Sequence, residues 1–145
     1  MVDTKSNSLW YVKKEEVKVY PVNLMSDKTR QITIYTWGKN FRDNFPYKLD
    51  CNFNVCEISY RNHTRDFDLR KSSGMDPDLK DRIMSTDKAR DFAVSIVNKV
   101  ERDNLHVIGI NCSKGKHRSV SIANYLKDVY YPSATVYHYE QKKYY

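Results

Sequence analysis

The segment Val107–Leu126 reads VIGINCSKGKHRSVSIANYL and joins an apolar run, a short basic turn and a second, amphipathic run. The apolar run over Leu105–Ile110 is continuous, which is typical of a strand covered on both faces. The second run predicts a helix that ends at Pro132, with four residues on its buried side: Val120, Ala123, Leu126 and Tyr130. A strand, a tight turn and a helix in this order predict an α/β unit.

Other strands are predicted where β-branched and aromatic residues gather between Asp, Asn, Gly and Pro. These runs are Val17–Val22, Gln31–Trp37, Phe53–Ser59 and Ala134–Tyr139. Because proline cannot donate to a strand ladder, Pro21 favours an edge position for the first run. We therefore expect residues 1–30 to form an N-terminal extension with an edge strand, and residues 31–145 to form the domain proper.

Two further helices precede the quoted segment. Asp76 can cap a short helix that starts at Pro77, with acidic Asp78 in its first turn. A longer helix follows Ser85 or Thr86, and its apolar residues recur at three- and four-residue spacing: Ala89, Phe92, Ala93, Ile96, Val97 and Val100. Strands that alternate with helices predict a single α/β domain with a mixed, partly parallel β-sheet and flanking helices.

Composition restricts the class of protein further. The chain has 145 residues, 25 Lys and Arg against 18 Asp and Glu, and a formal net charge of +7, which favours phosphates or acidic partners. Its three cysteines have no zinc-ligand spacing, and no secretory or membrane-length apolar segment is present. We therefore expect a cytoplasmic protein without a metal, a cofactor or a membrane partner.

The basic turn has the composition of an anion-binding loop. A strand that leads through a tight turn into a helix brings several backbone N–H groups to one point, at the positive end of the helix. Gly115 permits the dihedral angles that such a loop needs, and Arg118 can hold phosphate with two hydrogen bonds. Further donors surround them: Ser113, Lys114, Lys116, His117 and Ser119.

The same loop supports a second hypothesis. Cys112, five residues, Arg118 and Ser119 reproduce the C-x5-R-S signature of cysteine-dependent phosphatases, and a positive loop would lower the pKa of the thiol. Catalysis also needs a general acid, and none of the upstream aspartates lies in a recognisable acid-loop motif. Asn111 occupies the position where most of these enzymes have histidine. Enzymatic activity therefore stays open at this point, with Cys112 as its nucleophile.

The motif NCSKGKHRSVSIA resembles the loop of the RapZ C-terminal domain family, Gly-Cys-Thr-Gly-Gly-x-His-Arg-Ser-Val. The resemblance extends through CEISYRNHT, DLRKSSGMD and VYHYE, from Gln31 to Lys143. It implies a fold similar to a phosphofructokinase subdomain, a phosphorylated sugar ligand, RNA binding and self-association. A GxxxxGK[ST] nucleotide-binding pattern is absent, so we expect a stand-alone domain.

The resemblance also implies the positions of the sugar-phosphate contacts. They fall on His63, Ser113, Lys114, His117 and Arg118, and Arg70 joins them as a candidate because its Leu-Arg segment matches. Lys114 and Lys116 replace a glycine and a variable position of the family's loop, which favours a more highly charged ligand. The twelve tyrosines leave open whether exposed rings stack on RNA bases or pack in the sheet.

Overall fold

The computed structural model describes residues 29–55 and 74–145. In this part of the chain a five-stranded sheet has the order β2-β3-β1-β4-β5. The strands are β1 (Thr33–Gly38), β2 (Cys51–Asn54), β3 (Val107–Cys112), β4 (Thr135–His138) and β5 (Lys143–Tyr144). The first four are mutually parallel, and only β5 is antiparallel to its neighbour β4. This mixed sheet confirms the predicted α/β class.

Helices begin where the sequence supplies a cap. In α2 (Pro77–Met84) the side chain of Asp76 accepts a hydrogen bond from the N–H of Asp78, as expected of an N-cap. Of the two caps considered for α3 (Asp87–Asp103), the structure uses Thr86, whose hydroxyl accepts from the N–H of Ala89. The helix α4 (Arg118–Val129) directly follows the basic turn and has no side-chain cap.

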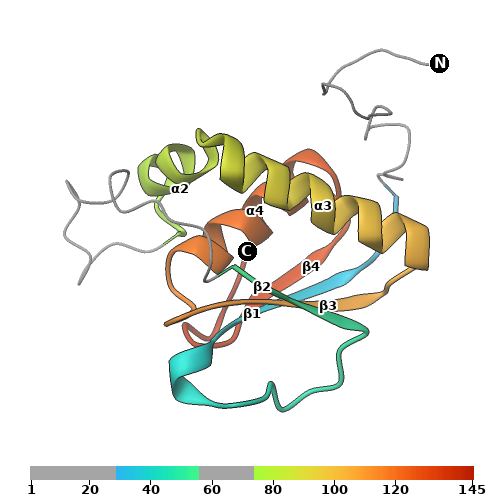
Figure 1. The fold of residues 1–145 in the computed structure, drawn as a ribbon, viewed down its shortest axis with the longest axis horizontal. Coiled ribbons are helices and arrows are strands. Elements are labelled where there is room, and N and C mark those ends of the chain that lie inside the picture. The colour runs from blue at the N-terminus through green and yellow to red at the C-terminus, as the bar shows by residue number, and fades with distance from the viewer. Residues whose placement is uncertain (1–28, 56–73) are drawn as a thin grey trace.

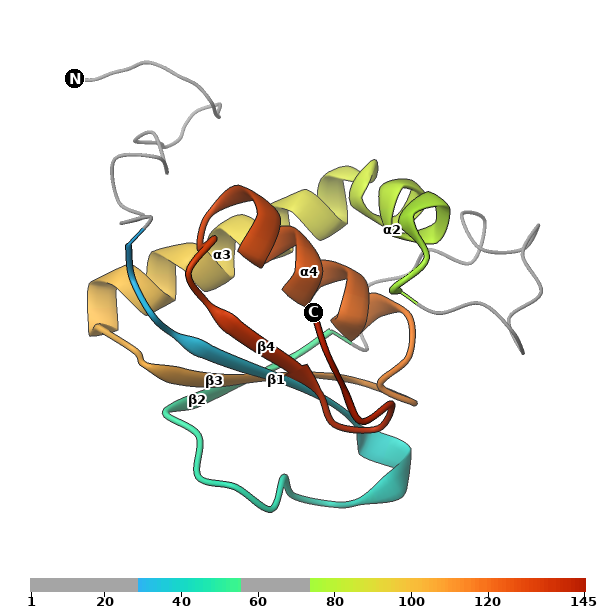
Figure 2. The same cartoon turned by 180° about the vertical axis from the view of Figure 1, so that it is seen from behind.

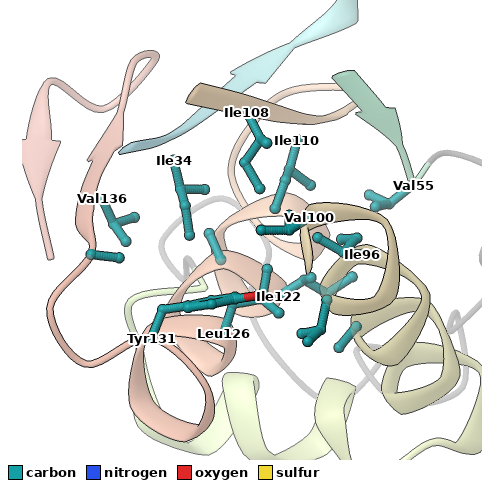
Figure 3. Packing of buried hydrophobic residues seen from close by; sticks show 14 of the residues in the cluster. Ile34, Val55, Ile96, Val100, Ile108, Ile110, Ile122, Leu126, Tyr131 and Val136 are labelled. Carbon is teal, nitrogen blue, oxygen red and sulfur yellow. The ribbon is translucent and has the colours of Figure 1, made fainter. Parts of the chain in front are cut away.

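The helices and the sheet form two layers. All three α-helices of the described chain cover the same face of the sheet (Figures 1 and 2). Between the layers, side chains from both sides interlock in a continuous core (Figure 3). Its fully buried members include Ile34, Ile96, Ile108, Ile110, Ile122, Leu126 and Val136. This core fixes α4, and therefore the loop before it, against the ends of β1 and β3.

Residues 39–50, which connect β1 to β2, lie on the other side of the sheet from the helices (Figure 2). Aromatic rings gather there. This connection contains the short 3-10 helix η2 (Lys39–Phe41). The ring of Phe45 lies 5.1 Å from those of both Tyr35 and Tyr139, measured between centroids. We call the rings on this side the aromatic face: Tyr35, Trp37, Phe45, Tyr47, Tyr137, Tyr139 and Tyr144.

The boundaries of β4 differ from the predicted ones by one residue at each end, whereas those of β2 and β3 differ by two residues or more. β3 begins at Val107 rather than at Leu105 and continues through Cys112, so the strand extends to the loop itself. β2 begins at Cys51, before the predicted Phe53. The prediction also missed β5 in the tyrosine-rich tail, where Tyr144 pairs with Tyr137. The strand predicted at Val17–Val22 lies outside the described residues.

His138 is a core residue and not part of a surface site. It is fully buried, its Nδ1 lies 2.7 Å from Oγ1 of Thr36, and its Nε2 lies 2.8 Å from Oδ1 of Asn124. A neutral ring satisfies both partners if Nε2 donates to Asn124 and Nδ1 accepts from Thr36. Desolvation by burial lowers the pKa of His138 to about 4. The histidine therefore joins β4, β1 and α4 as an uncharged group.

Acid should destabilise the protein through this histidine. Its folded pKa of about 4 lies below the ordinary value of 6.5, so the unfolded chain binds the proton first as the pH falls. Between pH 7 and pH 4.5, the wild type should lose roughly 2–3 kcal/mol more unfolding free energy than His138→Gln. Urea denaturation of both proteins at the two pH values measures the difference. Equal pH dependence in the two proteins would contradict the neutral assignment.

Candidate functional site

The basic loop lies where the carboxyl ends of three neighbouring strands meet. Parallel pairing places Gly38 at the end of β1 beside Cys112 at the end of β3, and β4 ends on the other side of β1. The loop after β3, η2 after β1 and the turn after β4 lie together at this end of the sheet (Figures 1 and 2). In open α/β sheets, ligands bind outside the carboxyl ends of the strands.

The thiol of Cys112 occupies the point toward which the loop's N–H groups converge. Its sulfur accepts a hydrogen bond from the N–H of Gly115 at 3.2 Å and lies 3.2 Å from the hydroxyl oxygen of Ser119. The backbone N–H groups of Lys116 and Ser119 also act on the sulfur, because they contribute to lowering the pKa of the thiol. Cys112 is only 3% exposed. The sulfur therefore forms the floor of a nest of donors.

These donors alter the acidity of the thiol. Burial is the largest single influence and by itself would raise the pKa of Cys112. The hydrogen bonds from the Ser119 hydroxyl and from the three backbone N–H groups together outweigh burial, so the pKa of Cys112 lies below its ordinary value. A loop that stabilises negative charge on sulfur has the polarity needed to stabilise a bound anion.

The basic side chains of the loop stay accessible around this buried floor. Lys114 is exposed, while Lys116, His117 and Arg118 are half-buried. Nη2 of Arg118 lies 3.5 Å from Oγ of Ser113, so the guanidinium extends back across the loop toward its first residue. Arg118 also begins α4, where the positive end of the helix favours an anion.

Backbone contacts from other segments hold the loop in place. The N–H of Asn40 in η2 donates to the carbonyl of Ser113 at 2.8 Å, and the N–H of Gly74 donates to the carbonyl of Lys116 at 2.7 Å. Gly115 has φ of 64°, and an added Cβ would lie 2.7 Å from the carbonyl carbon of Trp37 and 2.8 Å from the nitrogen of Gly38. The loop is therefore packed directly against the backbone at the end of β1.

Asn111 points away from the thiol. Its Oδ1 accepts from Nδ2 of Asn52 at 2.8 Å, and its own Nδ2 donates to Oδ1 of Asn54 at 3.2 Å. The indole N–H of Trp37 donates to Oδ1 of Asn52 at 2.8 Å and extends this network across three strands. Asn111 therefore ties β3 to β2 and does not replace the histidine of the cysteine phosphatases.

The structure brings together the part of the predicted site that lies in one loop: Cys112, Ser113, Lys114, Gly115, Lys116, His117, Arg118 and Ser119. His63 and Arg70 lie outside the described residues. The sequence analysis missed Glu140, which contacts Gly38 and lies beside Gly115. Its signal was a carboxylate placed just after a strand of a parallel sheet, at the end where sites form.

These features define a class of α/β protein with a basic loop between a strand and a helix at the carboxyl end of a parallel sheet. The family model described as RapZ C-terminal domain matches residues 30–143. The chain therefore belongs to the RapZ C-terminal domain family, as the resemblance of its loop and flanking motifs predicted.

Curated bacterial relatives carry the name nucleotide-binding protein. One from Finegoldia magna is 44% identical over 69 residues, which cover 41% of this chain and 24% of that protein. One from Brevibacillus brevis is 27% identical over 118 residues, 75% of this chain and 40% of the relative. One from Caldanaerobacter subterraneus is 27% identical over 138 residues, 89% and 47% of the two chains. The alignments thus span less than half of each relative.

No group of three or more His, Cys, Asp or Glu side chains in residues 29–55 and 74–145 is arranged to hold a metal ion. Within the same ranges, every helix is too short or too polar to cross a bilayer.

Proposed function

We propose that the loop Cys112–Ser119 binds the phosphate group of a small phosphorylated ligand, as part of a regulatory module. The observation that carries this proposal is that the N–H of Gly115 and the hydroxyl oxygen of Ser119 both lie 3.2 Å from the sulfur on the floor of the loop. Backbone N–H groups of the same loop lower the pKa of this thiol. Such a nest, placed before a helix, supplies fixed donors to an anion without the cost of ordering flexible side chains.

The side chains at the rim determine which phosphate compound fits best. Lys114, Lys116, His117 and Arg118 are all at least partly accessible, and they offer several positive charges around one anion site. Three of these four side chains are Lys or Arg, so a ligand with more than one ionised phosphate oxygen gains most. A phosphosugar or a nucleotide meets this requirement, and the name of the relatives is consistent with the second class.

Calorimetric titration of inorganic phosphate and of a hexose 6-phosphate into the wild type and Cys112→Ser tests this proposal. Because the phosphate contacts come from backbone N–H groups and Arg118, we expect Cys112→Ser to bind within about threefold of the wild type. We also expect neither protein to hydrolyse an aryl phosphate. Absence of saturable binding in the wild type would contradict the proposal.

A cysteine-dependent phosphatase is the second candidate function, and one observation favours it. The hydrogen bonds to the sulfur lower the pKa of Cys112, and Ser119 lies where its hydroxyl can stabilise the thiolate. The described carboxylates nearby are engaged elsewhere, since Asp76 caps α2 and Glu140 pairs with Arg42. Aryl phosphate turnover in the wild type that is lost in Cys112→Ser, with binding retained, would establish this candidate.

RNA is a proposed macromolecular partner, and the aromatic face supports it. Tyr47 is 53% and Tyr144 69% exposed, and Lys48 and Lys143 are exposed neighbours of these rings in the chain. Accessible rings beside lysines can stack on unpaired bases while the ammonium groups contact phosphates. RNA binding that weakens with rising salt and that inorganic phosphate does not displace would support an RNA-binding surface separate from the loop. The family resemblance also extends the proposal to self-association and a cytoplasmic location.

A further inference from the structure

A carboxylate beside an anion-binding loop requires an explanation, because negative charge there opposes the ligand. Glu140 lies in the turn after β4, and an added Cβ on Gly115 would approach its Cγ to 2.8 Å. The Glu140 side chain is only 13% exposed. The unfavourable charge is thus held close to the loop and is poorly screened by solvent.

Both hydrogen bonds of this carboxylate support the segment beneath the loop. Oε2 of Glu140 accepts from the backbone N–H of Gly38 at 2.9 Å and from Nη1 of Arg42 at 2.6 Å. The guanidinium carbon of Arg42 also lies 4.7 Å from the centroid of the Tyr139 ring. One carboxylate therefore joins the end of β1, η2 and the turn after β4.

The segment so fixed is the one on which the loop rests. An added Cβ on Gly38 would lie 2.6 Å from the carbonyl carbon of Lys114, so the two backbones are in direct contact. The N–H of Asn40, two residues further on, donates to the carbonyl of Ser113. A shift of residues 38–42 would therefore displace the first half of the loop, including the N–H of Gly115.

We infer that Glu140 is a positioning residue, which holds residues 38–42 against the Cys112–Ser119 loop and thereby keeps its N–H groups aimed at the anion site. Arg42 forms the ion pair with Glu140 that helps to hold this segment. The inference rests on the proposed function, because it concerns the support of the same site. The Glu140 carboxylate thus supports anion binding through its contacts, although its negative charge by itself repels the anion.

The two effects of Glu140 have opposite signs, so one binding measurement separates them. If only charge mattered, Glu140→Ala would bind phosphate more tightly than the wild type. If Glu140 positions the loop, Glu140→Ala should bind about tenfold more weakly, because misplaced donors lose most of their interaction. Glu140→Gln keeps an acceptor for the N–H of Gly38, so its affinity should fall between those of Glu140→Ala and the wild type.

Asp128 provides a charge-matched control. It pairs with Lys80 at 2.6 Å, the same distance as the Arg42–Glu140 pair. It lies ten residues beyond Arg118 on α4, about 15 Å along the helix axis. Asp128→Ala also removes one carboxylate, but it should change phosphate affinity by less than about twofold. An equal loss in Asp128→Ala and Glu140→Ala would overturn the inference.

A second measurement follows the loop without any ligand. Alkylation of Cys112, resolved by peptide mass spectrometry across a pH series, reports how well the N–H of Gly115 stabilises the thiolate. The midpoint should move to higher pH in Glu140→Ala and stay unchanged in Asp128→Ala. An unchanged midpoint in Glu140→Ala would overturn the inference. If the wild type binds no phosphate, the proposed function fails and this profile still decides the role of Glu140.

Discussion

Phosphate affinity should fall about 100-fold when Arg118 is replaced by alanine. A guanidinium can donate two charge-assisted hydrogen bonds to phosphate. A hydrogen bond to a charged group contributes roughly 1.5–3 kcal/mol. Arg118 begins α4 and its Nη2 lies 3.5 Å from Oγ of Ser113, so the side chain extends over the loop. Titration calorimetry with inorganic phosphate measures the loss.

Arg102→Ala is the matched control for this change. Arg102 pairs with Asp103 at the end of α3, and its side chain is 68% exposed. The substitution removes the same charge from the surface, but it should leave phosphate affinity within about twofold. Arg118→Lys should recover only part of the affinity, because an ammonium cannot form the paired contact. Equal affinities in Arg118→Ala and the wild type would exclude Arg118 from the site.

Gly115→Ala should remove phosphate binding and lower the unfolding free energy by roughly 2–4 kcal/mol. At a φ of 64° a side chain is strained, and the new Cβ would meet the backbone of Trp37 and Gly38 at 2.7–2.8 Å. Neither contact can be relieved by rotating a side chain, so the loop itself has to move. Urea denaturation and phosphate titration of the purified variant measure both effects.

Asn104→Ala is the control for Gly115→Ala, because it introduces the same kind of backbone strain at a position outside the loop. Asn104 also has a positive φ, 53°, but it lies at the exposed C-cap of α3. Alanine there should cost about 1–2 kcal/mol of stability and leave phosphate binding unchanged. Normal phosphate affinity in a folded Gly115→Ala protein would contradict the packing of the loop against β1.

The sequence predicted the elements whose signal is local. Asp76 before Pro77, the apolar spacing of α3 and the apolar run Leu105–Ile110 each depend on neighbouring residues, and the structure contains a helix or strand at all three places. β5 escaped prediction because a two-residue strand among lysines and tyrosines has no apolar alternation of its own. It exists because Tyr144 can pair with Tyr137 on a strand that the core has already fixed.

In the candidate site, too, only the residues with a local sequence signal were predicted. Ser113 to Ser119 could be assigned because the motif lies in consecutive residues. The sequence does not predict that the thiol lies against the Gly115 N–H and the Ser119 hydroxyl, since a buried cysteine in a strand can equally be a core residue. The support from Gly38, Asn40 and Glu140 joins segments that are far apart in the sequence: the N–H of Gly38 donates to Glu140, 102 residues further on, and the N–H of Asn40 donates to the carbonyl of Ser113. Such contacts depend on strand order, which no local pattern encodes.

We propose above all that the Cys112–Ser119 loop receives a phosphate group. Amide chemical shifts of the ¹⁵N-labelled protein, followed during titration with inorganic phosphate, test it residue by residue. We predict saturable shifts that are largest for the loop N–H groups of Gly115, Lys116 and Ser119, and that are absent in Arg118→Ala. Shifts confined to other surfaces, or a loop that does not respond at saturating phosphate, would contradict the claim.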